Sequence, residues 1–185
     1  MAARTAWMYQ EYAALPDDGK RYEIHDGELR EVTGPTWLHQ AVLFNLPKAL
    51  DSHASARNLG RIAIAPLDVI LSDRPGETTV LQPDIIYLDN GRLGARRPYG
   101  VEGSPTLVVE ILSPSTAMID RTTKRALYAR YAVPYFWLVD LDARVIEAQA
   151  LRAGEYAVAV AASGPRPVDL PPFTGLGLVP ETLWS

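Results

Sequence analysis

The sequence predicts an α+β fold with a mixed central β-sheet, flanked by helices and carrying extra antiparallel hairpins. The first observation is a near-continuous apolar run at 106–112, which is typical of a strand buried on both faces. The second is the order of the elements along the chain, which is helix, hairpin, helix, strands, helix, strand and hairpin. Strands and helices that alternate irregularly in this way favour a mixed sheet.

The N-terminal third contains two helices and a hairpin. Residues 5–14 form a short amphipathic pattern with Thr5 as a candidate N-cap. Tyr22 to Ile24 and Leu29 to Val32 then flank Asp26-Gly27, which is a strong hairpin turn signal. Residues 37–53 follow Gly34-Pro35-Thr36 with apolar side chains at helical spacing, and Pro47 predicts a kink or break in that helix.

The middle of the chain predicts strands. Residues 61–72 are strand-like, with Pro66 as a bend between two halves. Residues 79–88 form a second strand, which contains Gln82-Pro83-Asp84. Residues 89–104 are rich in Gly, Arg and Pro and predict an exposed loop with room for a helical turn.

The last third begins with a helix-start signal at Ser113-Pro114-Ser115-Thr116, and a helix is expected from about 117 to 132. Tyr135 to Leu141 forms another buried strand. Val145 to Leu151 and Tyr156 to Ala161 predict an outer antiparallel hairpin. The tail supplies apolar anchors at Phe173, Leu176, Leu178, Leu183 and Trp184.

Composition narrows the class of protein. The 185 residues have the size of one domain, 1–185, and are 48% apolar and 22% charged. The pattern contains neither a transmembrane run nor a signal peptide, and there are no cysteines, so a cytoplasmic location is expected. The net charge of −4 does not itself indicate a nucleic-acid partner.

Two carboxylates stand out as candidates for chemistry. Glu110 lies in the middle of the apolar strand, where an ionised carboxylate is costly unless it is paired or bound to a metal. A buried glutamate satisfied by an arginine or by backbone amides is an equal alternative. Asp84 follows Pro83 and is expected to share a strand face with Ile86 and Leu88, although Asp after Pro is often only a turn residue.

Lys124 is the most informative basic residue, since the chain has only two other lysines, Lys20 and Lys48. On a helical wheel Lys124 shares its face with Asp120, Leu127, Tyr128 and Tyr131, and this face is expected to point to the core. A buried lysine needs an acidic partner in the same cavity. The alternative is an i,i+4 pair with Asp120 and a stem that reaches to solvent.

Two acids and a lysine suit phosphodiester hydrolysis. Carboxylate oxygens bind Mg²⁺ or Mn²⁺, which can activate water and screen a phosphate. A nearby lysine can stabilise developing charge. Asp84 and Glu110 are therefore the predicted metal ligands, and Lys124 is the predicted group that orients the water or stabilises developing charge.

The sequence resembles the Uma2 family of the PD-(D/E)xK nuclease-like superfamily along almost its whole length. The resemblance rests on Tyr22 to Leu29, His39-Gln40, Ala65 to Val69, Gln82-Pro83-Asp84, Val108 to Ser115, Asp120 to Lys124, Tyr128-Ala129 and Tyr135 to Asp140. It implies a restriction-endonuclease-like core in which Pro83-Asp84 and Glu110 supply the acidic half-motifs. The lysine expected two residues after Glu110 is replaced by Leu112, and Lys124 resembles a migrated replacement.

The resemblance also implies a further glutamate from an early element. Glu23 and Glu28 are the candidates, and Glu23 is favoured because it lies in the more apolar strand. His39 opens a helix and is a candidate to hold a water or a phosphate, with a satisfied helix-start histidine as the equal alternative. Asp68 and Gln82 are weaker candidates that would support the acids.

Two functions remain open at this point. One is a metal-dependent endonuclease acting on nucleic acid, with DNA favoured and with Arg92, Arg96 and Arg97 as phosphate contacts. The other is an inactive nuclease-fold module that binds nucleic acid or a protein partner. The absent lysine after Glu110 and the acidic net charge favour the second. A homodimer or higher oligomer is expected from the apolar outer hairpin and tail.

Overall fold

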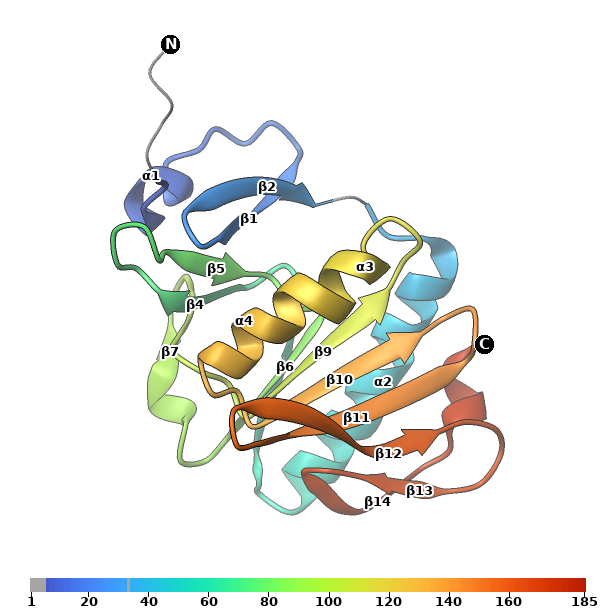
Figure 1. Cartoon of the computed structure of the whole chain (residues 1–185). Helices are drawn as coiled ribbons and strands as arrows, with labels where there is room; N and C mark the ends of the chain where they lie inside the picture. The colour runs from blue at the N-terminus through green and yellow to red at the C-terminus, as the bar shows by residue number, and fades with distance from the viewer. Residues whose placement is uncertain (1–5, 33) are drawn as a thin grey trace.

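The computed structural model describes residues 6–32 and 34–185, and two six-stranded sheets dominate them (Figure 1). The first sheet has the order β12-β11-β10-β9-β6-β3, and the second has the order β2-β1-β5-β4-β8-β7. The first is made of β3 (Gly60–Ile64), β6 (Ile85–Asp89), β9 (Leu107–Leu112), β10 (Tyr135–Asp140), β11 (Val145–Arg152) and β12 (Glu155–Ala162). The second is made of β1 (Arg21–His25), β2 (Glu28–Val32), β4 (Asp68–Ser72), β5 (Thr79–Leu81), β7 (Arg96–Arg97) and β8 (Gly100–Glu102).

The helices are few and mostly short. They are α1 (Tyr9–Ala13), α2 (Trp37–Ala56), α3 (Ala117–Ile119), the π-helical segment η2 (Asp120–Lys124) and α4 (Arg125–Arg130), with 3₁₀ turns η1 (Leu93–Ala95) and η3 (Pro180–Leu183). A small hairpin of β13 (Val168–Leu170) and β14 (Phe173–Leu178) lies near the C-terminus. The α+β class and the mixed sheet are confirmed, since β9 and β10 are parallel while β6, β11 and β12 join their neighbours antiparallel.

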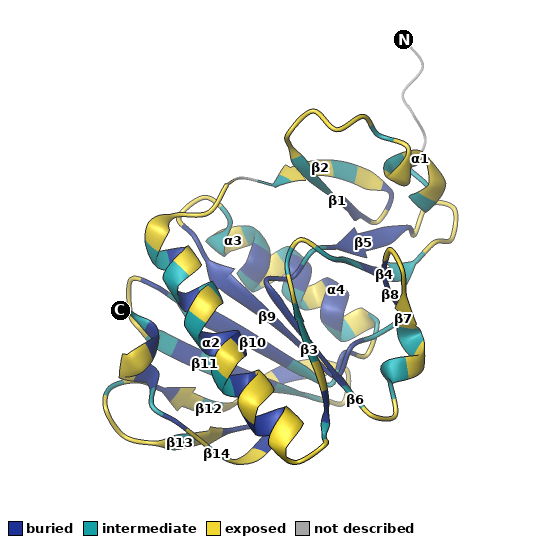
Figure 2. Ribbon diagram, turned by 180° about the vertical axis from the view of Figure 1, so that it is seen from behind, coloured by how far each residue is buried: buried dark blue, intermediate teal, exposed yellow. Residues whose placement is uncertain are grey.

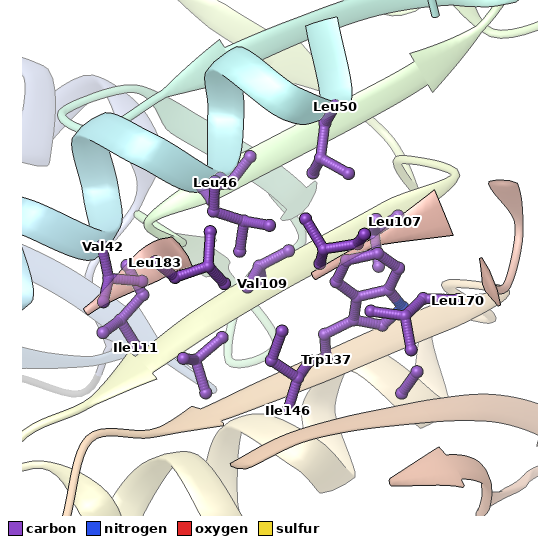
Figure 3. Close-up of a cluster of buried hydrophobic side chains, with 14 of the residues drawn as sticks. Val42, Leu46, Leu50, Leu107, Val109, Ile111, Trp137, Ile146, Leu170 and Leu183 are labelled. Carbon is purple, nitrogen blue, oxygen red and sulfur yellow. The ribbon is translucent and has the colours of Figure 1, made fainter. Parts of the chain in front are cut away.

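The central strand β9 faces a different helix on each side. Figures 1 and 2, which view the molecule from opposite sides, place α4 on one face of the first sheet and α2 on the other. Because side chains alternate along a strand, Leu107, Val109 and Ile111 join the core under α2. Figure 3 shows Val42, Leu46 and Leu50 of α2 pointing at this set. Val108 and Leu112 join the second core under α4, and Glu110 shares their parity.

Helix α2 is longer than expected and Pro47 does not break it. The helix runs from Trp37 to Ala56, begins with Thr36 accepting a hydrogen bond from the His39 N–H, and passes through Pro47. Proline inside a helix costs about 3 kcal/mol because one backbone hydrogen bond is lost. Val42, Leu46 and Leu50 are completely buried on both sides of Pro47, and their burial outweighs this cost.

Two of the crossings that the chain makes between the sheets lie at the same place. The bend expected at Pro66 separates β3 of the first sheet from β4 of the second. The single strand expected over 79–88 is wrong, because β5 ends at Leu81, β6 begins at Ile85, and the two belong to different sheets. Pro83 explains the break, since it has no N–H for a strand ladder. The Ala65 N–H donates to the Asp84 carbonyl at 3.0 Å, which joins the two crossings.

This break also corrects the environment expected for Asp84. Asp84 lies in the crossing before β6, so it does not share a strand face with Ile86 and Leu88. It lies instead at the joint between the sheets, where its carboxylate contacts Ile111 of β9 and His39 of α2.

The remaining differences concern element lengths. Helix α1 spans only Tyr9–Ala13 with Met8 at its N-cap, and the candidate cap Thr5 lies outside the described residues. The helix expected over 117–132 is one helical stretch that changes from α to π at Asp120 and back to α at Arg125, and it ends at Arg130. Within 89–104 the chain forms η1, β7 and β8, and Leu93 and Ala95 pack against the cluster around Val101.

The outer hairpin of β11 and β12 and the C-terminal tail pack on the molecule as expected. Strands β11 and β12 are antiparallel and lie at the outer edge of the first sheet. Phe173, Leu178 and Leu183 are buried in the core under α2, while Leu176 and Trp184 pack partly against it.

Candidate active site

Lys124 is the centre of an ion-pair cluster at the joint between the sheets. Its ammonium Nζ lies 2.9 Å from Glu23 Oε1, 3.1 Å from Glu110 Oε1 and 3.6 Å from Asp120 Oδ1. Lys124 is only 6% exposed, and Glu23, Glu110 and Asp120 are 2 to 3% exposed. The sequence prediction that Lys124 points inward and meets an acid is therefore matched by the geometry. The i,i+4 pair with Asp120, given as an alternative, forms in addition to the other pairs.

Local structure explains why these side chains meet. Glu110 lies at an even position of β9, and the even positions face the helical stretch 117–130. In that stretch Asp120, Lys124, Leu127 and Tyr128 are buried. The Tyr128 hydroxyl donates to Glu110 Oε1 at 2.7 Å, one turn beyond Lys124. The π-helical turn from Asp120 to Lys124 widens the helix next to this contact, as π turns often do at functional sites.

Glu23 reaches the cluster from the second sheet. It lies on β1, and its Oε1 accepts a hydrogen bond from the Gln82 N–H at 2.8 Å. The same oxygen forms the ion pair with Lys124. Its Oε2 lies 2.9 Å from His25 Nε2. Glu28, the other candidate, is exposed on β2 and pairs with Arg30. Of the two, Glu23 is the carboxylate that points inward.

Asp84 is held from two sides. Its Oδ2 accepts the N–H of Ile111 at 2.7 Å, and His39 Nε2 lies 3.2 Å from the same oxygen. His39 comes from the first turn of α2, which starts beside the hairpin. A narrow cavity of about 30 Å³ is lined by Asp84, Glu110, Asp120, Lys124 and His39, together with Gln82, Arg21 and neighbouring backbone. Four of the five predicted site residues, all but Glu23, therefore border one cavity.

The cluster contains more acid than base. Glu23, Asp84, Glu110 and Asp120 supply four carboxylates around one lysine. Burial raises the pKa of Glu110 well above its ordinary value even though Lys124 opposes the shift, and Asp120, Asp84 and Glu23 raise it further. Burial likewise raises the pKa of Asp120. Protonation of Glu110 and Asp120 would lower this negative charge.

Glu23 and Lys124 behave in the opposite way. Burial alone would raise the pKa of Glu23, but Lys124 and the contact with His25 outweigh it and lower that pKa to about 2. Burial alone would lower the pKa of Lys124, but Glu110, Glu23 and Asp120 raise it well above its ordinary value. These directions favour the charged forms of Lys124 and Glu23 and the protonated forms of Glu110 and Asp120.

Unsatisfied polar atoms gather at the same cavity. His39 Nδ1, Gln82 Oε1 and Asp120 Oδ1 are buried without a hydrogen-bond partner among residues 6–32 and 34–185, and so is His25 Nδ1 behind Glu23. Buried polar groups are nearly always satisfied by protein or by bound water. Hard oxygen donors, excess negative charge and unsatisfied atoms around a small cavity fit a hydrated divalent cation. Within the same residues, though, the side chains do not approach closely enough to form a three-ligand His, Asp and Glu set.

A second set of hydrogen bonds supports the acids from behind. Asp68 Oδ1 accepts from the Tyr12 hydroxyl at 2.9 Å and from Gln82 Nε2 at 2.9 Å. The backbone of Gln82 in turn holds Glu23. Asp68 and Gln82 thus occupy the supporting position expected of them.

Three members of the cluster have no predicted role in the site. The sequence indicates Asp120 as a helical partner of Lys124 and Tyr128 as a residue of the same core-facing surface. His25 lies two residues after Glu23 and so shares its strand face, and that spacing is the signal that identifies it.

The arginines of the 89–104 segment lie elsewhere. Arg96 and Arg97 line a separate hollow with Arg61 and Ile86. Arg97 pairs with Glu102 at 2.7 Å, and Arg92 donates to the Ser104 carbonyl at 2.7 Å. These contacts stabilise the segment, and phosphate binding by these arginines stays a prediction.

Comparison with models of known protein families shows which family the chain belongs to. The family model Uma2, described as "Putative restriction endonuclease", matches residues 9–181. The chain belongs to the Uma2 family. The match spans both sheets and every residue of the cluster around Lys124. No curated protein matches the sequence.

A solved structure shares the fold of this Uma2 protein. It is described as a "putative nuclease belonging to DUF820" from Anabaena variabilis ATCC 29413. The likeness covers 96% of this chain and 97% of that one, with a TM-score of 0.76 and 19% sequence identity. At this identity the likeness establishes the common architecture. Among the described residues, the helices are all too short or too polar to cross a membrane.

Proposed function

We propose that this Uma2 protein is a metal-dependent nuclease that hydrolyses phosphodiester bonds of nucleic acid, with DNA as the favoured substrate. The observation that carries the proposal is the buried Lys124, which contacts Glu110 and Glu23 beside a cavity that Asp84 also borders. A lysine surrounded by this many acids has no simple structural purpose, because an apolar side chain of similar size would be cheaper to bury. The family description and the fold of the Anabaena variabilis protein support the same function.

In this proposal Asp84 and Glu110 hold Mg²⁺ or Mn²⁺. A bound divalent ion supplies a water of lowered pKa and screens the phosphate. The Ile111 N–H and His39 orient Asp84, and Tyr128 orients Glu110. Lys124 supplies a fixed positive charge for the phosphate, and Glu23 keeps it protonated and in position.

The test is cleavage of supercoiled plasmid, linear DNA and RNA by purified protein with Mg²⁺ or Mn²⁺. Wild type is expected to nick or cut at least one of these substrates, and Asp84→Asn and Glu110→Gln are expected to abolish cleavage. Lys124→Ala is expected to lower the rate by about 10²- to 10³-fold, the usual effect of removing one charge-stabilising group. Lys20→Ala is the matched control, because Lys20 is half exposed and pairs with Glu31 in a surface ion pair.

Two results would contradict the proposal. One is a wild type that leaves every substrate intact with either metal. The other is cleavage that persists in Asp84→Asn and Lys124→Ala, since this would identify a contaminating enzyme.

A second candidate function is an inactive nuclease-fold module that binds nucleic acid or a protein partner. The direct ion pair between Lys124 and Glu110 favours it, because it closes the lysine onto a predicted metal ligand. Leu112 stands where a lysine is expected two residues after Glu110, and the net charge is −4. Binding of DNA by the wild type without cleavage, and without any stabilisation by metal, is the result that this second function predicts.

A further inference from the structure

A second and larger cavity opens next to the acidic one. It has a volume of about 430 Å³ and shares Arg21, Pro35, His39 and Asp84 with the small cavity. We call it the side groove. Its remaining lining residues are Gln40, Leu43, Phe44, Ile64, Ala65 and Pro66. The side groove therefore lies between the exposed face of α2 and the crossing at Pro66, and it leads directly to Asp84.

The wall of the side groove is unusually apolar for an exposed surface. Phe44 is 66% exposed and Ile64 is 48% exposed, although both are large apolar residues. Lys48 lies over the Phe44 ring, with its Nζ 4.5 Å from the ring centroid. Arg21 and His39 border the opposite end, toward the acids. An apolar wall with Lys48 and Arg21 at its edges complements a flat aromatic ring attached to a phosphate.

The size and the charge of the molecule favour one kind of occupant. A volume of about 430 Å³ is within the range of small-ligand sites and suits a single base with its sugar. Duplex-binding proteins usually have strongly positive surfaces, because phosphate contacts supply most of their affinity. This chain has a net charge of −4, so stacking on an exposed aromatic side chain must supply more of the binding free energy.

We propose that the side groove binds an unpaired base next to the scissile phosphate, with Phe44 as its stacking platform. The proposed nuclease would then act on single-stranded or locally unpaired nucleic acid in preference to a continuous duplex. This inference rests on the proposed function, since the groove gains its meaning from the neighbouring Asp84 and Glu110. It adds the substrate class, which the acidic cluster by itself does not specify.

The experiment compares kcat/KM on a single-stranded DNA oligonucleotide, the same oligonucleotide in a full duplex, a duplex with a three-nucleotide bulge, and an RNA of the same sequence. Wild type with Mn²⁺ is expected to cleave the single strand and the bulge at least tenfold faster than the duplex. Phe44→Ala is expected to lower kcat/KM on the single strand by about tenfold, and Phe44→Trp is expected to retain it. Comparison of the RNA with the single-stranded DNA shows whether binding in the side groove depends on the base alone or also on the sugar.

The matched control is Tyr99→Ala, which removes an exposed aromatic ring from the turn between β7 and β8. Equal cleavage of single strand and duplex, or equal effects of Phe44→Ala and Tyr99→Ala, would overturn the proposal. A change of molar mass from dimer to monomer in Phe44→Ala, seen by light scattering, would also overturn it, because the occupant would then be a second copy of the chain.

A binding measurement separates this inference from the proposed function. Fluorescence anisotropy of end-labelled single strand and duplex is recorded with Glu110→Gln, with and without Phe44→Ala. Suppose that the wild type cleaves nothing, but the single strand binds and Phe44→Ala lowers its affinity about tenfold. The groove proposal then holds, and the nuclease function is rejected. If cleavage succeeds but single strand and duplex bind alike in both variants, only the groove proposal is lost.

Discussion

At the scale of single residues, Glu110 combines two opposite requirements. In the proposed function its carboxylate must be charged to hold a metal ion, yet burial raises its pKa well above the ordinary value. Ionisation of Glu110 would then serve the proposed chemistry and destabilise the folded state. The same conflict does not arise for Glu23, because Lys124 and His25 lower its pKa to about 2 against the effect of burial.

This conflict gives a prediction for Glu110→Gln. A carboxyl with a higher pKa in the folded chain than in the unfolded chain binds its proton more tightly when folded. Stability is therefore lost as pH rises from about 4.5, the ordinary value, through the folded pKa. Gln keeps an oxygen for Lys124 and Tyr128 but never ionises. In EDTA, Glu110→Gln should melt a few degrees above wild type at pH 8, and this difference should vanish near pH 4.

The control is Glu28→Gln, since Glu28 is exposed on β2 and pairs with Arg30 at the surface. Its melting temperature should follow wild type at both pH values. If Glu110→Gln melts below wild type at pH 8, the carboxylate is charged and stabilising in the folded state, and the assignment of its raised pKa is wrong.

At the scale of elements, the β1–β2 hairpin delivers Glu23 and depends on its turn. Asp26 and Gly27 both have positive φ, at 49° and 82°, as a two-residue hairpin turn of this kind requires. Gly27 also joins three segments, since it accepts from the Trp7 N–H and donates to the Thr78 carbonyl, each at 2.8 Å. A Cβ at this position would lie 3.0 Å from the Cβ of Ala6.

Gly27→Ala should therefore destabilise the protein by about 1–2 kcal/mol, from the strain of positive φ and from this close contact. Gly19→Ala is the matched variant, because Gly19 also has positive φ, at 77°, but a Cβ there meets nothing within 4 Å. Urea unfolding should give a larger loss for Gly27→Ala than for Gly19→Ala. Equal losses would mean that the packing against Ala6 contributes nothing.

Much of the element order could be predicted from the sequence, for local reasons. The Asp26-Gly27 turn, the apolar run of β9 and the helical start at Thr36 each depend on a few neighbouring residues. The uninterrupted passage of α2 through Pro47 could not be predicted, because it depends on core packing from other strands. The division of 79–88 between two sheets was missed for a similar reason, since strand partners far along the chain decide it.

The same distinction between local sequence and long-range contacts decides which residues of the candidate site could be predicted. Lys124 could be placed inward because its helical face is recorded in nearby residues such as Leu127 and Tyr128. Glu23 could only be favoured over Glu28, because its position depends on the way the second sheet meets the first. The sequence indicates Asp120 only as an i,i+4 partner of Lys124 and gives His25 no role, since the contacts that bring them to the cluster run through Lys124 and Glu23.

At the scale of the whole molecule, the excess of buried acid predicts that the proposed metal would stabilise the folded state. Four carboxylates and one lysine share a region in which unsatisfied polar atoms also gather. A cation that binds only the folded state stabilises it by mass action. At metal concentrations about ten times the dissociation constant, the gain is on the order of 1 kcal/mol.

Weak metal sites have dissociation constants in the millimolar range. Mn²⁺ or Mg²⁺ at about 5–10 mM should therefore raise the melting temperature by about 2–4 °C. Asp84→Asn should abolish this rise, because it removes one of the two predicted ligands. Asp169→Asn is the control, since Asp169 is an exposed aspartate that accepts the N–H groups of Gly175 and Gly177. A rise that persists unchanged in Asp84→Asn would place the metal elsewhere.

The expected self-association now depends on one edge of the molecule. The tail cannot supply it as first expected, because Phe173, Leu178 and Leu183 are buried in the chain's own core. Strand β12 remains, since it is the outermost strand of the first sheet and its sequence Ala157-Val158-Ala159-Val160 carries no charge. An uncharged edge strand is a template for pairing with another copy.

We therefore expect a dimer in which β12 joins β12, and light scattering at about 10–100 μM should give twice the mass of the chain. Val158 is 55% exposed, so Val158→Lys should yield a monomer with little change in folding. A wild type that is already monomeric at these concentrations would exclude this interface.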